Sequence, residues 1–340
     1  DQFQYASEVM SLKARGVSIP NIAWQDSTFS IFNNLLTIPT NPVTFSVTFL
    51  GLAPIPNFMT VTSLAFANKF FLFVSFLMLK NFFKNENILL LLFLIPSLLL
   101  YSSISLRETL IILAGIFFLL NILRNNYLIS IVCLLPLLIL KIQLFAFFAT
   151  YFIGRLVFRA HKNFYALGIY LIFILVLGFI LEETLLQTIN YYRIGFAAEG
   201  MDMGDGVYGY YAFSLYGDAD SLTLNSMFEV IWTAIIGLPA LLLMPLPNSW
   251  TSIFYPVQFL ESIFLIFIYS SMAIKNNLLR NQEFIYLSFV LVLSLMLYSV
   301  LAFNVGTMVR YRFSLFLPFV FAVYYLATLN PVDSSKNNIE

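Results

Sequence analysis

The stretch "FIYLSFVLVLSLMLYSVLAF", residues 284–303, holds twenty residues without a single charge. Twenty residues of helix are about 30 Å long, which matches the hydrocarbon core of a bilayer. The motif "NVGTMVRYR", residues 304–312, follows, and a second apolar run occupies residues 313–326. The sequence therefore predicts two membrane helices, with Arg310 and Arg312 at the mouth of the second.

The composition extends this prediction to the whole chain. Of 340 residues, 60% are hydrophobic, 18% aromatic and only 10% charged, which is typical of a polytopic membrane protein. The net charge of zero gives no reason to expect nucleic acid as a partner, and the single Cys133 forms no disulfide framework. Because residue 1 is Asp and no signal-peptide pattern follows, we expect that the natural protein begins further upstream.

Apolar windows predict an all-α bundle of about ten transmembrane or re-entrant helices, forming a single membrane domain over residues 1–340. Prolines in 42–56 and 226–255 indicate broken or re-entrant pieces. The expected spans lie near residues 58–79, 88–103, 106–123, 127–140, 143–158, 164–181, 226–244, 256–274, 284–303 and 313–329.

Basic residues predict the orientation, because short cytoplasmic loops retain Lys and Arg. The spans alternate correctly if 226–255 enters and leaves on one side and if nine basic residues lie inside. These nine are Lys80, Lys84, Arg124, Arg155, Arg159, Lys162, Lys275, Arg280 and Lys336. Arg107, Arg193, Arg310 and Arg312 are then outside, where basic residues are disfavoured, and they become candidates for function.

Two outer segments have local signatures. Residues 1–41 are expected to form an external interfacial segment, because "DQFQYASEVMSLKARG" places Asp1, Tyr5, Glu8, Val9 and Leu12 on one helical stripe. Residues 182–225 are expected to form an external loop. The region 182–229 holds eight of the seventeen acidic residues and one arginine, Arg193, and it is rich in Gly and Tyr.

Four segments together resemble a known family. They are "PSLLLYSSISLRE" (96–108), the acidic loop, "GLPALLLMPLPNSW" (237–250) followed by "ESIF", and "NVGTMVRYRFSLFLP" (304–318). The chain resembles bacterial Wzy-type O-antigen and exopolysaccharide polymerases, and more broadly the lipid-linked-sugar glycosyltransferases of the GT-C superfamily.

The resemblance implies glycosyl transfer between oligosaccharide repeat units carried on undecaprenyl diphosphate, at the outer face of the bacterial inner membrane. It implies no nucleotide sugar, cofactor or known metal. The lipid-linked oligosaccharide, membrane lipid and other polysaccharide-assembly proteins would be the partners. The outer arginines would be ligands of the lipid diphosphate. Asp1, which resembles the acidic residue that follows the first span in GT-C enzymes, would compete with Glu108 for the role of the catalytic base.

The arginines of the opening motif fit a diphosphate on chemical grounds alone. A guanidinium keeps its charge and offers a planar fork of donors to phosphate oxygens. Arg310 and Arg312 would point to one side in an extended loop but to opposite sides on a helix. Asn304, Gly306 and Thr307 favour the loop. The alternative is that both arginines are interfacial anchors.

Three further positions are candidates. Ser105 and Glu108 have the spacing of a capping box, which would leave Arg107 for a ligand; Glu108 is either this cap or a general base. Lys141 is a further candidate ligand of the lipid diphosphate; it interrupts two apolar runs and marks either a polar cavity or a short external turn. Tyr192, Tyr208 and Tyr210 could stack on sugar rings or belong to an interfacial aromatic belt.

Two pairs of aspartates and several other functions are alternatives to this interpretation. The pairs Asp202/Asp205 and Asp218/Asp220 could hold a hard cation, but a turn-forming loop explains them, and we predict no metal site. Besides polymerisation, the remaining alternatives are a single-sugar GT-C transferase, a transporter of lipid-linked glycans and a membrane scaffold protein. A transporter is expected to show inverted repeats, and no convincing repeat is present.

Overall fold

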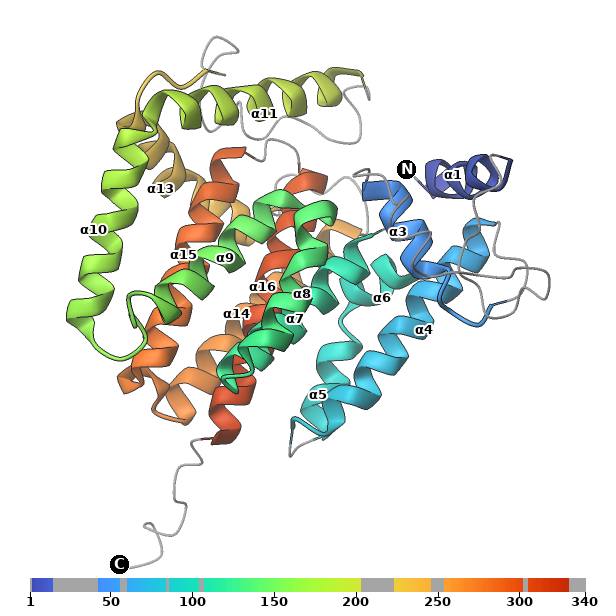
Figure 1. The fold of residues 1–340 in the computed structure, drawn as a ribbon, viewed down its shortest axis with the longest axis horizontal. Helices are drawn as coiled ribbons and strands as arrows, with labels where there is room; N and C mark the ends of the chain where they lie inside the picture. Colours follow the sequence, from blue (N-terminus) through green and yellow to red (C-terminus); the bar gives the residue numbers. More distant parts are fainter. Residues whose placement is uncertain are drawn as a thin grey trace, which may run out of the picture. The chain divides into compact units, whose positions relative to one another are not determined.

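The fold of the chain is all-helical, as predicted. A computed structural model describes residues 2–14, 42–55, 60–83, 86–103, 107–202, 223–245, 254–301 and 305–329. Within these ranges every regular element is a helix and no strand occurs (Figure 1). Contacts gather in two compact units, residues 1–148 and 149–340, which divide within one helix. Each unit is therefore described by itself, and the single domain over 1–340 stays a prediction.

Unit 1 is built around one central helix, α7. Fourteen side chains of α7 are buried, on all sides of the helix, which is why its sequence is apolar all round. Helix α8 runs back along it (Figure 1). The unit contains α1 (Gln2–Ala14), α3 (Pro42–Leu50), α4 (Val61–Lys80), α5 (Glu86–Phe93), α6 (Pro96–Ser103), α7 (Glu108–Leu123), α8 (Tyr127–Leu140) and the first half of α9 (Ile142–Leu156).

The first helix confirms part of the predicted stripe. Tyr5 and Val9 are buried, and the Glu8 carboxylate accepts a hydrogen bond of 2.7 Å from Thr44 Oγ1 on α3. The rest of the external segment, residues 15–41, lies outside the described residues. The stripe thus packs α1 against α3.

The predicted span 88–103 is wrong as a continuous helix. Helices α5 and α6 meet at an angle of 56°, with the break at Leu94 and Ile95. Pro96 begins α6, where a missing backbone N–H costs nothing, and it disfavours the α conformation at Ile95. The proline therefore accounts for the bend.

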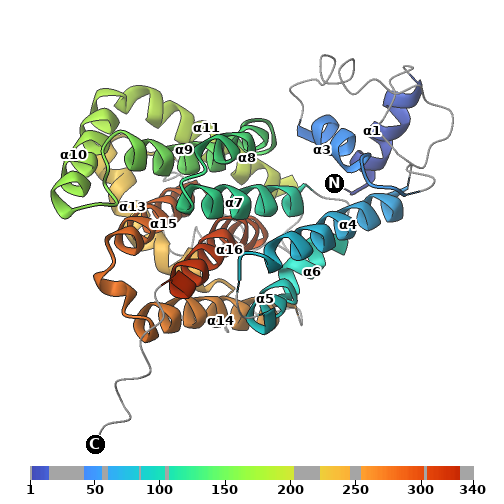
Figure 2. The ribbon, with the colours of Figure 1, turned by 60° about the horizontal axis from the view of Figure 1, so that its bottom comes forward.

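Unit 2 packs α14, α15 and α16 beside one another (Figure 2). Helix α16 is the most enclosed candidate span, with 83% of its apolar window buried. After the second half of α9 the unit contains α10 (Phe164–Ile180), α11 (Glu182–Asp202), α13 (Met227–Leu243), α14 (Phe254–Lys275), a 3₁₀ turn (Leu278–Arg280), α15 (Gln282–Leu301) and α16 (Val305–Leu329).

The predicted external loop 182–225 begins as a helix instead. Residues 182–202 form α11, and its first part, up to Ile194, turns away from α10 by 79° (Figure 1). Its acidic first turn, Glu182 and Glu183, suits a helix N-terminus, because carboxylates there face the positive end of the helix dipole. The content of Gly and Tyr was therefore a poor guide to this segment. Residues 203–222 lie outside the described part.

Helix length supports part of the predicted span count. Four described helices are long and apolar enough to cross a membrane, or up to six if each bent pair forms one span. Four more apolar helices, namely α7, α8, α9 and α13, have 14 to 17 residues. A membrane protein with several spanning helices follows from these lengths, whereas about ten crossings does not.

Candidate functional site

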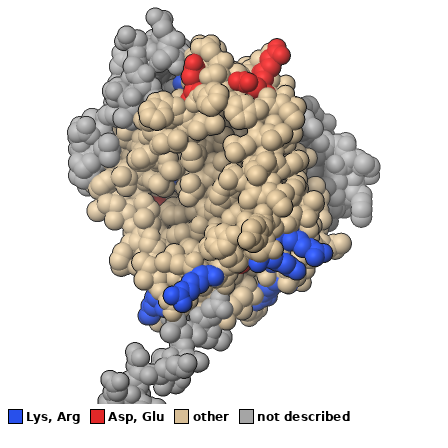
Figure 3. All heavy atoms as spheres, turned by 90° about the vertical axis from the view of Figure 1, so that its left-hand side faces the viewer, with Lys and Arg blue, Asp and Glu red and all other residues tan. Residues whose placement is uncertain are grey.

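Charge separates the two ends of unit 2. Arg159, Lys162, Lys275 and Arg280 are exposed at one end, and Glu183 and Glu229 at the other. Helix α10 connects the ends with 17 residues, about 25 Å, of uncharged and mostly exposed sequence. Figure 3 shows the same pattern on one face, where Lys and Arg lie along the lower edge and Asp and Glu near the upper edge. We call these the basic end and the acidic end.

The directions of the helices place Arg310 and Arg312 at the acidic end. Tyr269 of α14 contacts Phe284 of α15, and Tyr298 of α15 contacts Tyr311 of α16, so α15 runs opposite to both neighbours. The Arg193 Nη1 atom of α11 donates to the Val300 carbonyl, near the end of α15. Because α11 begins with the acidic pair, α15 ends and α16 begins at the acidic end.

The expected extended loop at Arg310 and Arg312 is wrong, because both residues belong to α16. Successive residues of a helix are about 100° apart, so these two side chains leave the axis about 200° apart. Arg312 is 4% exposed, whereas Arg310 is half-buried. The helix therefore gives the two arginines different surroundings, and sequence spacing alone could not show which conformation the motif adopts.

Arg312 holds the buried end of another helix. Its Nη1 atom donates to the carbonyls of Leu241, Leu242 and Met244, at 3.1, 3.0 and 2.7 Å. These carbonyls belong to the last turn of α13 and its C-cap, where a helix leaves acceptors without intrahelical partners. A cation there also faces the negative end of the helix dipole. Arg312 thus stabilises a helix terminus inside the unit.

Helix α13 starts at the acidic end and packs against α15. The Met227 amide donates to Glu182 Oε1, which fixes the start of α13 beside α11. Seven residues later, the Ala234 carbonyl accepts from Ser299 Oγ, still near the end of α15. Helix α13 ends at Leu243, within the predicted broken piece 226–255, and its re-entrant course stays a prediction.

Arg193 has a similar role at the end of α15. It is 2% exposed, and its bond of 2.7 Å to the Val300 carbonyl satisfies an acceptor in the last turn of that helix. Tyr192, the adjacent candidate for sugar binding, is half-buried and packs against the ring of Tyr191 at 5.7 Å. Arg193 is thus fixed to backbone, and the Tyr192 ring is one face of a pair.

Glu261 is a buried carboxylate that the sequence reasoning missed. It is 7% exposed, on α14. Tyr269 of α14 contacts Phe316 of the parallel helix α16, so these two residues lie at the same level. Glu261 is eight residues before Tyr269, and Arg310 is six residues before Phe316. The levels of Glu261 and Arg310 along the helix axes therefore differ by only about 3 Å. An acidic residue inside the quoted apolar segment "ESIF" was the available signal.

Sequence reasoning also missed a polar cluster at the basic end. Arg155 of α9 forms an ion pair with Glu283 of α15, and Tyr151 donates to the same carboxylate at 2.6 Å. Tyr286 donates to the Tyr151 carbonyl at 2.7 Å. A Cβ on Gly154 would overlap the Tyr286 hydroxyl, so glycine permits this close approach. The cluster joins α9 and α15.

His161 adjoins this cluster in the turn between α9 and α10. Burial, together with the positive charges of Arg155, Lys162 and Arg159, lowers its pKa from 6.5 to about 4. Its Nδ1 atom is buried without a hydrogen-bond partner among the described residues. His161 is therefore neutral at physiological pH.

Two unit 1 candidates lie where α7 begins. The expected capping box is wrong, because α7 starts at Glu108, and Arg107 is the N-cap without a side-chain capping bond. Glu108 is 4% exposed and Arg107 half-buried. A carboxylate in the first turn suits the helix dipole, so the buried position of Glu108 agrees with both the structural and the catalytic hypothesis.

Lys141 lies at a turn between two helices, and the external position of that turn stays a prediction. It is the C-cap of α8, one residue before α9 begins, and it is 7% exposed. A cation at this position stabilises the C-terminal end of α8 through the helix dipole. The turn thus explains the break in the apolar run.

Several predictions lie outside the described residues. They are Asp1, Tyr208, Tyr210 and three of the possible cation ligands, Asp205, Asp218 and Asp220. Asp202 belongs to α11, but its side chain is not described. Within the described ranges, no three His, Cys, Asp or Glu side chains cluster in a metal-binding arrangement.

Comparison with known proteins adds no relative: no family model, curated protein or solved structure matches the chain.

Proposed function

We propose that this chain joins undecaprenyl-diphosphate-linked oligosaccharide repeat units into a surface polysaccharide, at the outer face of a bacterial inner membrane. The observation that carries the proposal is the buried carboxylate of Glu261 on α14 at about the level of the half-buried Arg310 on the neighbouring helix α16, in the acidic half of unit 2. Ionisable groups at membrane depth are costly and mark substrate sites more often than structural ones. The resemblance of the surrounding motifs supplies the reaction class.

The orientation follows from charge. The basic end of unit 2 belongs in the cytoplasm by the positive-inside rule, so the acidic end faces outward. The basic residues of unit 1 fit the same rule. Lys80 ends α4 and Arg124 follows α7, and both are cytoplasmic if successive spans cross the membrane in alternation. In this topology the apolar helical segments make about ten crossings or re-entrant pieces, and α13 is re-entrant. Broken helices in membranes occur where they are buried in protein or line a cavity, and substrate sites of membrane transporters are often built from them.

The transfer step requires a cation and a base. An acceptor hydroxyl oxygen attacks the anomeric carbon of the donor sugar, and the bond from that carbon to the diphosphate oxygen breaks with its electron pair. The proton of the hydroxyl passes to a carboxylate, and undecaprenyl diphosphate leaves. Negative charge grows on the departing oxygen, so a fixed guanidinium stabilises the transition state more than the ground state.

Arg310 is the proposed diphosphate ligand, because it is the more accessible arginine of the motif. Arg312 is a positioning residue that keeps the end of α13 in place. Glu261 is the proposed base, since it lies at the level of Arg310 on the next helix, in the same unit. Glu108 and Asp1, the bases expected from sequence, remain candidates of the other unit, as do the ligands Arg107 and Lys141.

The test is incubation of the purified protein with synthetic undecaprenyl-diphosphate oligosaccharide. We expect a ladder of products that differ by whole repeat units. A single addition would indicate a transferase that adds one sugar. Unchanged substrate would favour a transporter. Either of these results removes the polymerase proposal.

A further inference from the structure

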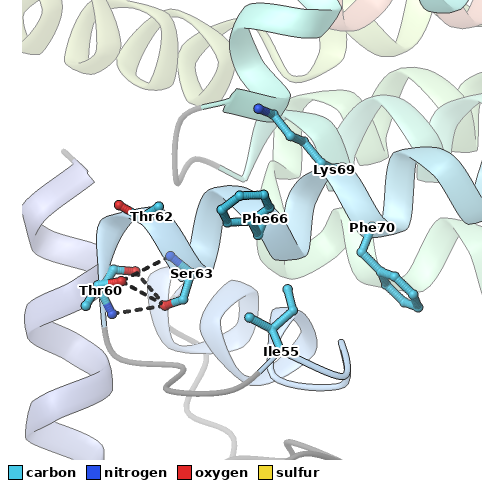
Figure 4. Close-up of a pocket in the computed structure, with 7 residues that line it drawn as sticks. All are labelled: Ile55, Thr60, Thr62, Ser63, Phe66, Lys69 and Phe70. Carbon is cyan, nitrogen blue, oxygen red and sulfur yellow. Dashed lines mark hydrogen bonds between the residues drawn. The ribbon is translucent and has the colours of Figure 1, made fainter.

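Unit 1 carries a hollow at the start of α4 that none of the proposed chemistry uses. Its volume is about 690 Å³, within the range of small-molecule and lipid sites. It is lined by Ile55, Thr60, Thr62, Ser63, Phe66, Lys69 and Phe70 (Figure 4). We call it the α4 groove. None of these residues is acidic, and Lys69 is the one charged residue among them.

The position of Lys69 in a membrane helix needs an explanation. Helix α4 is a candidate span, and Lys69 lies nine residues after its N-cap Thr60, about 13 Å along the axis. It is exposed, next to the exposed rings of Phe66 and Phe70. An ammonium group at this depth, facing lipid, is costly without a partner.

The other lysine of α4 shows how such a charge is usually satisfied. Lys80, at the opposite end of the helix, lies 2.9 Å from a carboxylate oxygen of Glu86. Among the described residues, the Lys69 ammonium faces only the Phe66 ring, with its nitrogen 5.9 Å from the ring centroid. A cation–π contact at that distance compensates little of the lost hydration. Lys69 therefore lacks a described anionic neighbour, and Lys80 has one.

Hydroxyl groups line one end of the same hollow, at the start of α4 (Figure 4). Thr60 and Ser63 form a reciprocal capping box, in which Ser63 N donates to Thr60 Oγ1 at 3.1 Å and Thr60 N donates to Ser63 Oγ at 3.0 Å. These two side chains serve the helix itself. Thr62 lies on the exposed side of the first turn (Figure 4), so its hydroxyl can donate outward.

We propose that the α4 groove binds the phosphate headgroup of a membrane lipid. Lys69 supplies the charge, the Thr62 hydroxyl donates a further hydrogen bond, and Ile55, Phe66 and Phe70 contact the start of the hydrocarbon chain. A lysine side chain leans toward the N-terminus of its helix, which carries the ammonium toward the membrane surface, where phosphates lie. A cation between apolar side chains at a lipid-facing surface fits a phospholipid or an isoprenoid phosphate better than a soluble anion. This site does not depend on the proposed polymerase activity.

The experiment compares lipids that differ only in the phosphate. Purified protein in detergent micelles is titrated with phosphatidic acid or with diacylglycerol of the same chains, and bound lipid is counted by native mass spectrometry. We expect phosphatidic acid to bind at least tenfold more tightly to wild type, because hydrogen bonds to charged groups are among the stronger ones. Lys69→Gln is expected to remove most of this preference and Lys69→Arg to keep it.

Lys80→Gln is the matched control, since it removes the same charge from the same helix at a site that already has a carboxylate. It is expected to leave the preference unchanged. Equal binding of the two lipids, or equal effects of Lys69→Gln and Lys80→Gln, would overturn the proposal. Displacement of phosphatidic acid by inorganic phosphate at equal concentration would also overturn it, because the site would then recognise a free anion. These lipid-binding results do not depend on whether the protein forms polymer in the ladder assay.

Discussion

The two ends of unit 2 use buried arginine in different ways. At the basic end, Arg155 pairs with the Glu283 carboxylate and links side chains of two complete helices. At the acidic end, Arg312 binds backbone carbonyls of α13, a helix that ends inside the unit. The first arrangement fastens helices that already satisfy their own backbone. The second satisfies carbonyls at the end of a helix that stops inside the protein, where they have no intrahelical partner.

The largest effect is expected at the basic end. Glu283→Gln removes a charge and leaves Arg155, whose side chain is 5% exposed, buried beside a neutral amide. Breaking one partner of a buried ion pair costs about 3–5 kcal/mol of unfolding free energy. Unfolding in detergent, followed by helical circular dichroism, measures the loss. Glu183→Gln, at an exposed position, is the control and should change stability little; equal losses in both variants contradict the assigned role.

Arg312 should contribute less to stability but more to activity. Arg312→Ala leaves three carbonyls of α13 without this donor, which costs about 1.5–3 kcal/mol for a charged hydrogen-bond donor. Arg312→Lys keeps the charge and should recover part of the stability, although polymerisation falls about tenfold because the planar geometry is lost. Both quantities are measured on the same preparations. Full activity with reduced stability would show that the end of α13 does not shape the site.

The smallest effect is a pH dependence at His161. Its pKa is about 4 in the folded chain and about 6.5 when unfolded, so the unfolded chain binds more protons between these values. Stability therefore falls as the pH is lowered from about 6.5 to about 4. Because His161 is only half-buried, the change is expected to be modest. The variant His161→Gln should lose this dependence, so that its free energy of unfolding changes less between about pH 6.5 and pH 4. Identical pH dependence in the variant and the wild type would contradict the role assigned to His161.

The helical fold could be predicted from sequence because membrane helices require long uncharged runs, as residues 284–303 illustrate. Breaks were harder to predict. The bend before Pro96 is local and visible in the sequence, but it was overlooked within an otherwise apolar window. The start of α11 was also misjudged, because turn-forming composition further along the segment outweighed its acidic first turn.

The site was predicted less well, for a physical reason. The type of residue indicates that Arg312 is unusual, but its partners are carbonyls some 70 positions earlier, and backbone acceptors carry no sequence signal. The level of Glu261 beside α16 depends on helix register, which spacing does not reveal. By contrast, the turn at Lys141 is local, so the interrupted apolar run could indicate it, whereas its predicted external position stays a prediction.

The most direct measurement pairs two arginines from opposite ends of unit 2 in the ladder assay. Arg310→Ala is expected to reduce formation of polymer from undecaprenyl-diphosphate oligosaccharide at least tenfold at equal protein level, because the diphosphate loses its guanidinium. Arg159→Ala, at an exposed site of the basic end, is expected to retain wild-type turnover and chain lengths. Wild-type ladders from Arg310→Ala, or equal losses in both variants, would contradict a diphosphate site at the acidic end.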